Sequence, residues 1–149
     1  MKAELATWNN GDGVDLETWH SCLGNYSSAV GYSTLFWPTF CKHKEYIFRA
    51  GVSPSSVQSW ENTGVTKQAL EWTINHIHIS DLYPGAEDYS NDKAFAIANQ
   101  LREIYQAKLN WQFPNDPCIV EIYIPEAEDD SEDDFIDYQV SFWQQKHEE

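Results

Sequence analysis

The sequence has few of the residues that build covalent or metal-bound frameworks. It contains three cysteines in 149 residues, Cys22, Cys41 and Cys118, and no CxxC pair. An odd number of scattered cysteines indicates neither a disulfide framework nor a structural zinc site. The sequence therefore predicts reduced thiols and no bound metal ion.

Long apolar runs and catalytic motifs are also missing. No segment approaches the roughly 20 apolar residues that a membrane span requires, and residues 1–13 lack the apolar region of a secretory signal. There is no GxSxG and no phosphate-loop spacing of glycines, so no hydrolase or nucleotide-binding signature is present. We expect a soluble, cytoplasmic protein without a cofactor, and the sequence favours a protein without enzymatic activity.

Positive charge is scarce. Nine Lys and Arg residues stand against 24 Asp and Glu, which gives a formal net charge of −15. Binding to nucleic acid or to anionic membranes requires clustered cations, and this composition disfavours both. A basic protein partner is compatible with it, because negative potential attracts a cationic surface. Acidity that serves solubility alone is the alternative interpretation.

Carboxylates are concentrated in one segment, residues 126–134, which we call the acidic run. It holds seven carboxylates in nine residues, and without them the net charge would be −8 rather than −15. Mutual repulsion should keep this segment flexible and solvated. It is a solvated loop, a contact surface for a basic protein, or a binding site for a divalent metal ion. The residues proposed for that contact are Glu128, Asp129, Asp130, Glu132, Asp133 and Asp134.

Aromatic residues are abundant, with seven tryptophans and eight tyrosines. Trp19, Trp37 and Trp72 lie near apolar stripes and are expected in the core. The tryptophans near loops or element ends are Trp8, Trp60, Trp111 and Trp143. Exposed aromatic rings in such positions commonly serve recognition, and we assign Trp111 and Trp143 as partner contacts.

The first half of the chain predicts helices and one strand. The stretch from Tyr26 to Arg49 is expected to nucleate the core. Its apolar residues from Tyr26 to Trp37 follow helical spacing, and Pro38 ends that helix near Phe36. Residues 40–49 alternate as a single strand. The cap residues Asp15, Ser53 and Thr66 indicate helix starts. Residues 73–79 fit either a helix or a strand.

The second half predicts a long helix and a hairpin. Ser90 precedes a helix that is expected over residues 91–109, which carry an apolar stripe. Residues 118–124 and 135–143 are β-rich runs that should pair with each other, with the acidic run at the hairpin tip. The expected fold is α+β, with a small antiparallel sheet of at least three strands covered on one face by four or five helices. We expect a single domain over 1–149, with a flexible acidic hairpin loop at 126–134.

Two pairs of side chains are candidates for metal binding or nucleophilic chemistry. On a helix, residues two apart diverge by about 200°, so His76 and His78 can share a metal ion only if their segment is extended. Cys41 and His43 lie on one face of the predicted strand, but nothing in the sequence orients the histidine for nucleophilic chemistry.

The composition suggests a non-catalytic binding protein, in the manner of an immunity or inhibitor protein. In this hypothesis the acidic run and the two tryptophans contact a basic protein surface. The alternative is a small enzyme or small-molecule-binding domain with an aromatic-lined pocket. A pocket holding a titratable group with a shifted pKa would favour the alternative.

Overall fold

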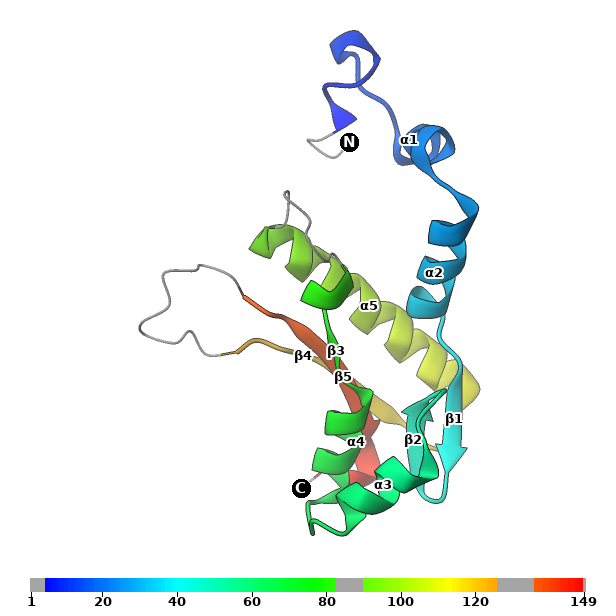
Figure 1. Cartoon of the computed structure of the whole chain (residues 1–149), viewed down its shortest axis with the longest axis vertical. Helices are drawn as coiled ribbons and strands as arrows, with labels where there is room; N and C mark the ends of the chain where they lie inside the picture. Colours follow the sequence, from blue (N-terminus) through cyan, green and yellow to red (C-terminus); the bar gives the residue numbers. More distant parts are fainter. Residues whose placement is uncertain (1–4, 83–89, 126–135, 149) are drawn as a thin grey trace. The chain divides into compact units, whose positions relative to one another are not determined.

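The computed structural model describes residues 5–82, 90–125 and 136–148 (Figure 1). The chain falls into two compact units, Met1–Leu35 and Phe36–Glu149. The described residues form five α-helices and two antiparallel sheets, which confirms the α+β class. Within these ranges, no helix has the length and apolar character needed to cross a membrane.

The first unit contains the short 3-10 helix η2 (Asn9–Gly11) and helix α1 (Leu16–Leu23), and α2 (Tyr26–Phe36) begins in it. The Asp15 carboxylate caps α1 by accepting hydrogen bonds from the Thr18 amide (2.7 Å) and hydroxyl (3.1 Å), and these bonds lower the pKa of Asp15. No residue of α1 or α2 is buried, and Tyr26 is 84% exposed. The helical part of the stretch Tyr26–Arg49 therefore contributes no buried residue, whereas Phe40, Tyr46, Ile47 and Phe48 in its second part belong to the core.

The second unit contains both sheets. Strands β1 (Phe40–His43) and β2 (Tyr46–Arg49) form a hairpin, and β3 (Ile77–His78), β4 (Cys118–Tyr123) and β5 (Gln139–Gln144) form a sheet in the order β3-β5-β4. The predicted C-terminal hairpin is confirmed, because Val120 pairs with Phe142 and Tyr123 with Gln139. The third strand of this sheet is β3.

Residues 40–49 form two strands where the sequence predicts one. The chain reverses at Lys44 and Glu45, and Lys44 adopts a left-handed backbone with φ 54°. No glycine or asparagine marks this turn. Its two charged residues are held by ion pairs from neighbouring helices, Lys44 with Glu61 at 2.6 Å and Glu45 with Lys67 at 2.7 Å. Tertiary contacts therefore support a turn that lacks the usual sequence signal.

Three helices surround the sheets, namely α3 (Pro54–Glu61), α4 (Lys67–Asn75) and α5 (Asn91–Gln112). The side chains of Ser53, Thr66 and Ser90 each cap one of them, as their positions in the sequence predict. Short 3-10 helices follow β3 (η3, Ser80–Leu82) and β5 (η4, Gln145–His147). The segment 73–79 contains both structures that the sequence allows, because α4 ends at Asn75 and β3 starts at Ile77.

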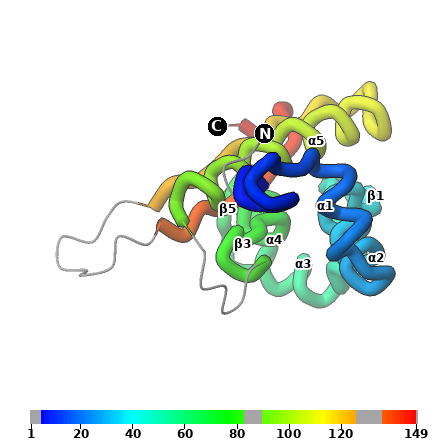
Figure 2. Tube along the Cα trace, turned by 90° about the horizontal axis from the view of Figure 1, so that it is seen from above, coloured from blue at the N-terminus to red at the C-terminus, as the bar shows by residue number. Residues whose placement is uncertain are grey.

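Helix α5 runs alongside β4 and β5 (Figures 1 and 2). Its buried residues are Ala94, Ala98, Leu101, Tyr105, Lys108 and Leu109. The Phe40 ring joins this helix to the sheet through edge-on contacts with Tyr105 (5.4 Å) and Phe142 (5.1 Å). Trp72 of α4 reaches the opposite face of β5, where it packs against Trp143 at 5.6 Å. Helical side chains therefore contribute to both faces of this strand.

Two fully buried polar side chains of α4, Glu71 and Asn75, join the two sheets. Glu71 accepts hydrogen bonds from the amides of Ile47 in β2 and Gln144 in β5, both at 2.8 Å. Asn75 donates to the carbonyl of Ile47 (2.9 Å) and to that of Phe142 (3.2 Å). A helix thus supplies, through side chains, the hydrogen bonds that a further strand would supply between β2 and β5.

Candidate functional site

The residues that the sequence assigns to partner binding differ in their exposure to solvent. Trp111 is 72% exposed, as predicted, near the end of α5. Trp143 is only 4% exposed, so its assignment as a surface contact is wrong. It lies on the face of β5 that Trp72 covers, and a strand covered on both faces has no free side. The carboxylates that complete the set lie outside the described residues, and they are Glu128, Asp129, Asp130, Glu132, Asp133 and Asp134.

Trp111 forms a surface pair with Trp37, which is itself 54% exposed. Their ring centroids are 6.3 Å apart and the rings are inclined by 33°. We call Trp37 and Trp111 the tryptophan pair. The sequence places Trp37 in the core, because it continues the helical stripe of α2, but Pro38 follows it and the chain then turns into β1. The sequence therefore misses half of this surface.

Lys108 supports the tryptophan pair from beneath. Its ammonium group donates hydrogen bonds to the carbonyls of Trp37 (3.3 Å) and Pro38, and lies 4.7 Å from the centroid of the Trp37 ring. The side chain is 6% exposed, and desolvation lowers its pKa. A cation against the face of an aromatic ring holds that ring in place. Lys108 thus holds the Trp37 ring on its buried side, and the other side of the tryptophan pair is exposed to solvent.

The tryptophan pair and Ile136, the first described residue after the acidic run, lie near opposite ends of α5. At the start of the helix, Asn91 accepts a hydrogen bond from the Ile136 amide (3.0 Å), just after the acidic run in the chain. Near its end, Gln106 bonds to the first residues of β4. Asn91 and Trp111 are separated by 20 residues of helix, or about 30 Å. The tryptophan pair is therefore distant from Ile136, and the acidic run itself lies outside the described residues.

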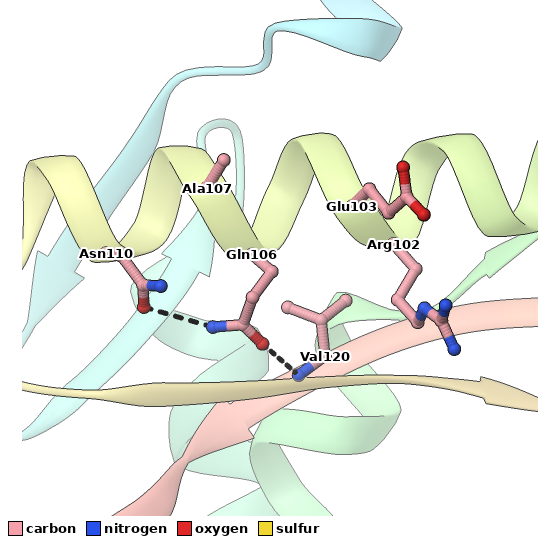
Figure 3. Close-up of a pocket in the computed structure, with 6 residues that line it drawn as sticks. All are labelled: Arg102, Glu103, Gln106, Ala107, Asn110 and Val120. Carbon is pink, nitrogen blue, oxygen red and sulfur yellow. Dashed lines mark hydrogen bonds between the residues drawn. The ribbon is translucent and has the colours of Figure 1, made fainter.

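A groove of about 500 Å³ lies between α5 and β4 (Figure 3). The residues that line it are Arg102, Glu103, Gln106, Ala107, Asn110 and Val120. Gln106 spans it, donating to the Cys118 carbonyl (2.8 Å) and to Asn110 (3.0 Å) and accepting from the Val120 amide (3.2 Å). Its lining includes no aromatic residue, so it does not match the aromatic-lined pocket of the alternative hypothesis.

The buried carboxylate of Glu71 also contacts a histidine. Nδ1 of His147 donates to Glu71 at 2.9 Å, while its Nε2 is buried, with no hydrogen-bond partner among the described residues. A carboxylate that orients a histidine is one half of a general-base arrangement. Here the His147 side chain is 4% exposed, so no substrate reaches the free nitrogen. The pair serves the packing of the C-terminal segment against α4.

The other candidate pairs differ in their geometry. Cys41 and His43 lie on β1, and no group among the described residues orients His43, which leaves an ordinary strand face. The segment of His76 and His78 is extended, which is the condition under which these two histidines can share a metal ion. His76 has extended backbone (φ −65°, ψ 148°) and His78 is in β3, and their rings are 4.9 Å apart.

We expect the three thiols to differ in reactivity. Cys118 is 6% exposed and burial raises its pKa to about 12, with the nearby charges of Glu71 and Asp116 adding to the shift. Because the thiolate is the nucleophile, a raised pKa suppresses reaction. Cys22 and Cys41 are exposed. Titration of the native protein with a disulfide reagent at mildly alkaline pH should modify these two thiols. Denaturant should expose the third thiol, that of Cys118, to the reagent.

The variant Cys118→Ala is the matched control for this titration. It should show the native level of labelling both before and after denaturation. Equal rates for all three thiols in the native wild-type protein would contradict the burial of Cys118.

No family model, no curated protein and no solved structure matches this chain.

Proposed function

We propose that this protein is a non-catalytic binding protein that recognises a basic protein surface, in the manner of an immunity or inhibitor protein. The observation that carries the proposal is the tryptophan pair. Two indole rings exposed to 54% and 72% form an aromatic surface beside a buried lysine. Tryptophan is enriched among the residues that dominate binding energy at protein interfaces. Such a surface is costly in water and is explained by a partner that covers it.

Charge supports a basic partner. The net charge of −15 gives the protein a long-range attraction for cationic surfaces, and that attraction raises association rates. A standard interface of about 800 Å² on each side is about 30 Å across. An interface that includes both the tryptophan pair and Ile136, the first described residue after the acidic run, would need this full width. We therefore assign the tryptophan pair to close contact and the acidic run to attraction during approach.

The proposed division predicts different kinetic effects for the two regions. Replacing the carboxylates of the acidic run with Ser and Gly should lower the association rate and weaken its salt dependence. Steering fades as salt shortens the Debye length, which is about 8 Å at 0.15 M. Trp37→Ala and Trp111→Ala should mainly raise the dissociation rate. The measurement is surface-binding kinetics across a salt series, with the partner recovered by pull-down from native cell extract.

Trp60→Ala is the matched control, because Trp60 is also exposed (37%) but belongs to a different element, α3. It should leave both rates unchanged. The variant without the carboxylates should keep its melting temperature, since repulsion and hydration hold such a segment off a core. An association rate indifferent to salt and to the acidic run would refute acidic recognition. A dissociation rate unchanged by both tryptophan variants would refute the aromatic contact.

A further inference from the structure

His76 and His78 lie where α4 passes into the edge strand of the three-stranded sheet (Figure 1). Residues two apart on an extended chain direct their side chains to the same face. The two imidazole rings accordingly lie together, with centroids 4.9 Å apart and planes inclined by 79°. Two imidazoles that bind one tetrahedral zinc ion at about 2.0–2.1 Å have ring centroids about 5 Å apart. The spacing of the pair suits a shared ion.

The hydrogen bonds of the two rings fix which nitrogen is free. Nδ1 of His76 lies 2.5 Å from the carbonyl oxygen of Thr73, which can only accept, so Nδ1 carries the proton. Nδ1 of His78 lies 2.5 Å from a carboxylate oxygen of Asp137, whose other oxygen accepts from the Ser80 hydroxyl at 2.7 Å. In the neutral form of each ring, the one that binds metal ions, the lone pair is therefore on Nε2. Neither Nε2 has a hydrogen-bond partner within the described ranges.

This arrangement is the one that metal-binding histidines use. Such histidines donate their second ring N–H to a carboxylate or a backbone carbonyl, which fixes the tautomer and makes the ligand more basic. His78 has the carboxylate and His76 has the carbonyl. The His78 side chain is 33% exposed, so solvent reaches the pair. No third His, Cys, Asp or Glu completes a ligand group among the described residues. The remaining coordination positions would hold water or an added ligand.

We propose that Nε2 of His76 and Nε2 of His78 bind one divalent transition-metal ion, Zn²⁺, Ni²⁺ or Cu²⁺. Imidazole ligands suit these ions, whereas Mg²⁺ and Ca²⁺ prefer oxygen. Asp137 is a positioning residue that acts through His78, and Ser80 holds Asp137 in turn. The proposal is independent of the proposed binding function, since it rests on residues outside the tryptophan pair and the acidic run.

Calorimetric titration of the chelator-treated full-length protein with ZnCl₂ or CuCl₂ tests this site. We expect one ion per chain, no binding of MgCl₂ at the same concentrations, and an electron paramagnetic resonance spectrum of bound Cu²⁺ with coupling to imidazole nitrogens. Asp137→Asn should weaken binding about 10- to 100-fold, as loss of a supporting group does. His76→Ala and His78→Ala should each weaken it further. His43→Ala is the matched control and should bind as the wild type does.

Two measurements separate this site from other metal binding. The variant without the acidic run should retain the histidine site, so loss of binding in that variant would assign the ion to carboxylates and overturn the proposal. On the wild-type protein, nitrogen NMR of the histidine rings should show Zn²⁺ shifting Nε2 of His76 and His78 while both Nδ1 protons remain. Because this second measurement uses the wild-type protein, it does not depend on whether a variant folds. Zn²⁺ that shifts neither Nε2 would equally overturn the proposal.

Discussion

Glu71→Ala should cost about 2–6 kcal/mol of unfolding free energy, because it leaves at least two buried backbone amides without an acceptor at about 1–3 kcal/mol each. Those amides belong to Ile47 and Gln144, and the His147 ring loses its partner as well. A loss of this size is a large share of the 5–15 kcal/mol that stabilises a typical domain. We therefore expect either a strongly lowered denaturation midpoint or an unfolded protein by circular dichroism.

Glu103→Ala is the matched control for this substitution. Glu103 is an exposed glutamate on α5, and its loss should change stability by less than about 0.5 kcal/mol. Glu71→Gln keeps one acceptor oxygen but turns an amide group toward the remaining donors, so it should fall between wild type and Glu71→Ala. A Glu71→Ala protein within about 1 kcal/mol of wild type would show that the amides find other acceptors, and our account of α4 would then be wrong.

Leu101→Ala should destabilise the protein by about 2–5 kcal/mol, the range for a buried leucine that loses its side chain and leaves a cavity. Leu101 is fully buried in the middle of α5. Chemical denaturation measures the change, and its neighbour Gln100, which is exposed, provides the control variant Gln100→Ala. A loss below about 0.5 kcal/mol for Leu101→Ala would place this side chain outside the core.

The sequence predicts the elements whose signals are local. The buried stripe of α5 follows from its own periodicity, and the caps at Asp15, Ser53, Thr66 and Ser90 follow from side chains that satisfy free amides in the first turn. The pairing of β4 with β5 follows from two alternating runs close in the chain. None of these depends on distant residues, which is why the pattern alone suffices.

The sequence fails where distant groups decide the structure. In α4 the apolar Ile74 is only partly buried, whereas the polar Glu71 and Asn75 are fully buried. These two are buried because β2 and β5 present backbone groups that need partners, and hydropathy does not record that need.

The candidate contact surface is predicted only in part, because the sequence shows local exposure but not contacts with distant residues. Trp111 is correctly placed because the end of a long helix is exposed by local criteria. Trp143 is wrongly placed because Trp72, distant in the chain, covers the second face of β5. The histidine pair is left open by the sequence, since its geometry depends on the residue at which α4 ends.

The polar side chains of the helices also close the edges of the strands. An open strand edge is a template on which another chain can add a strand, and it leads to aggregation. Glu71 and Asn75 occupy the backbone groups of β2 and β5 that face α4. Gln106 does the same for the outer edge of β4, at Cys118 and Val120. Together α4 and α5 thereby protect the two short sheets from joining the sheets of other molecules.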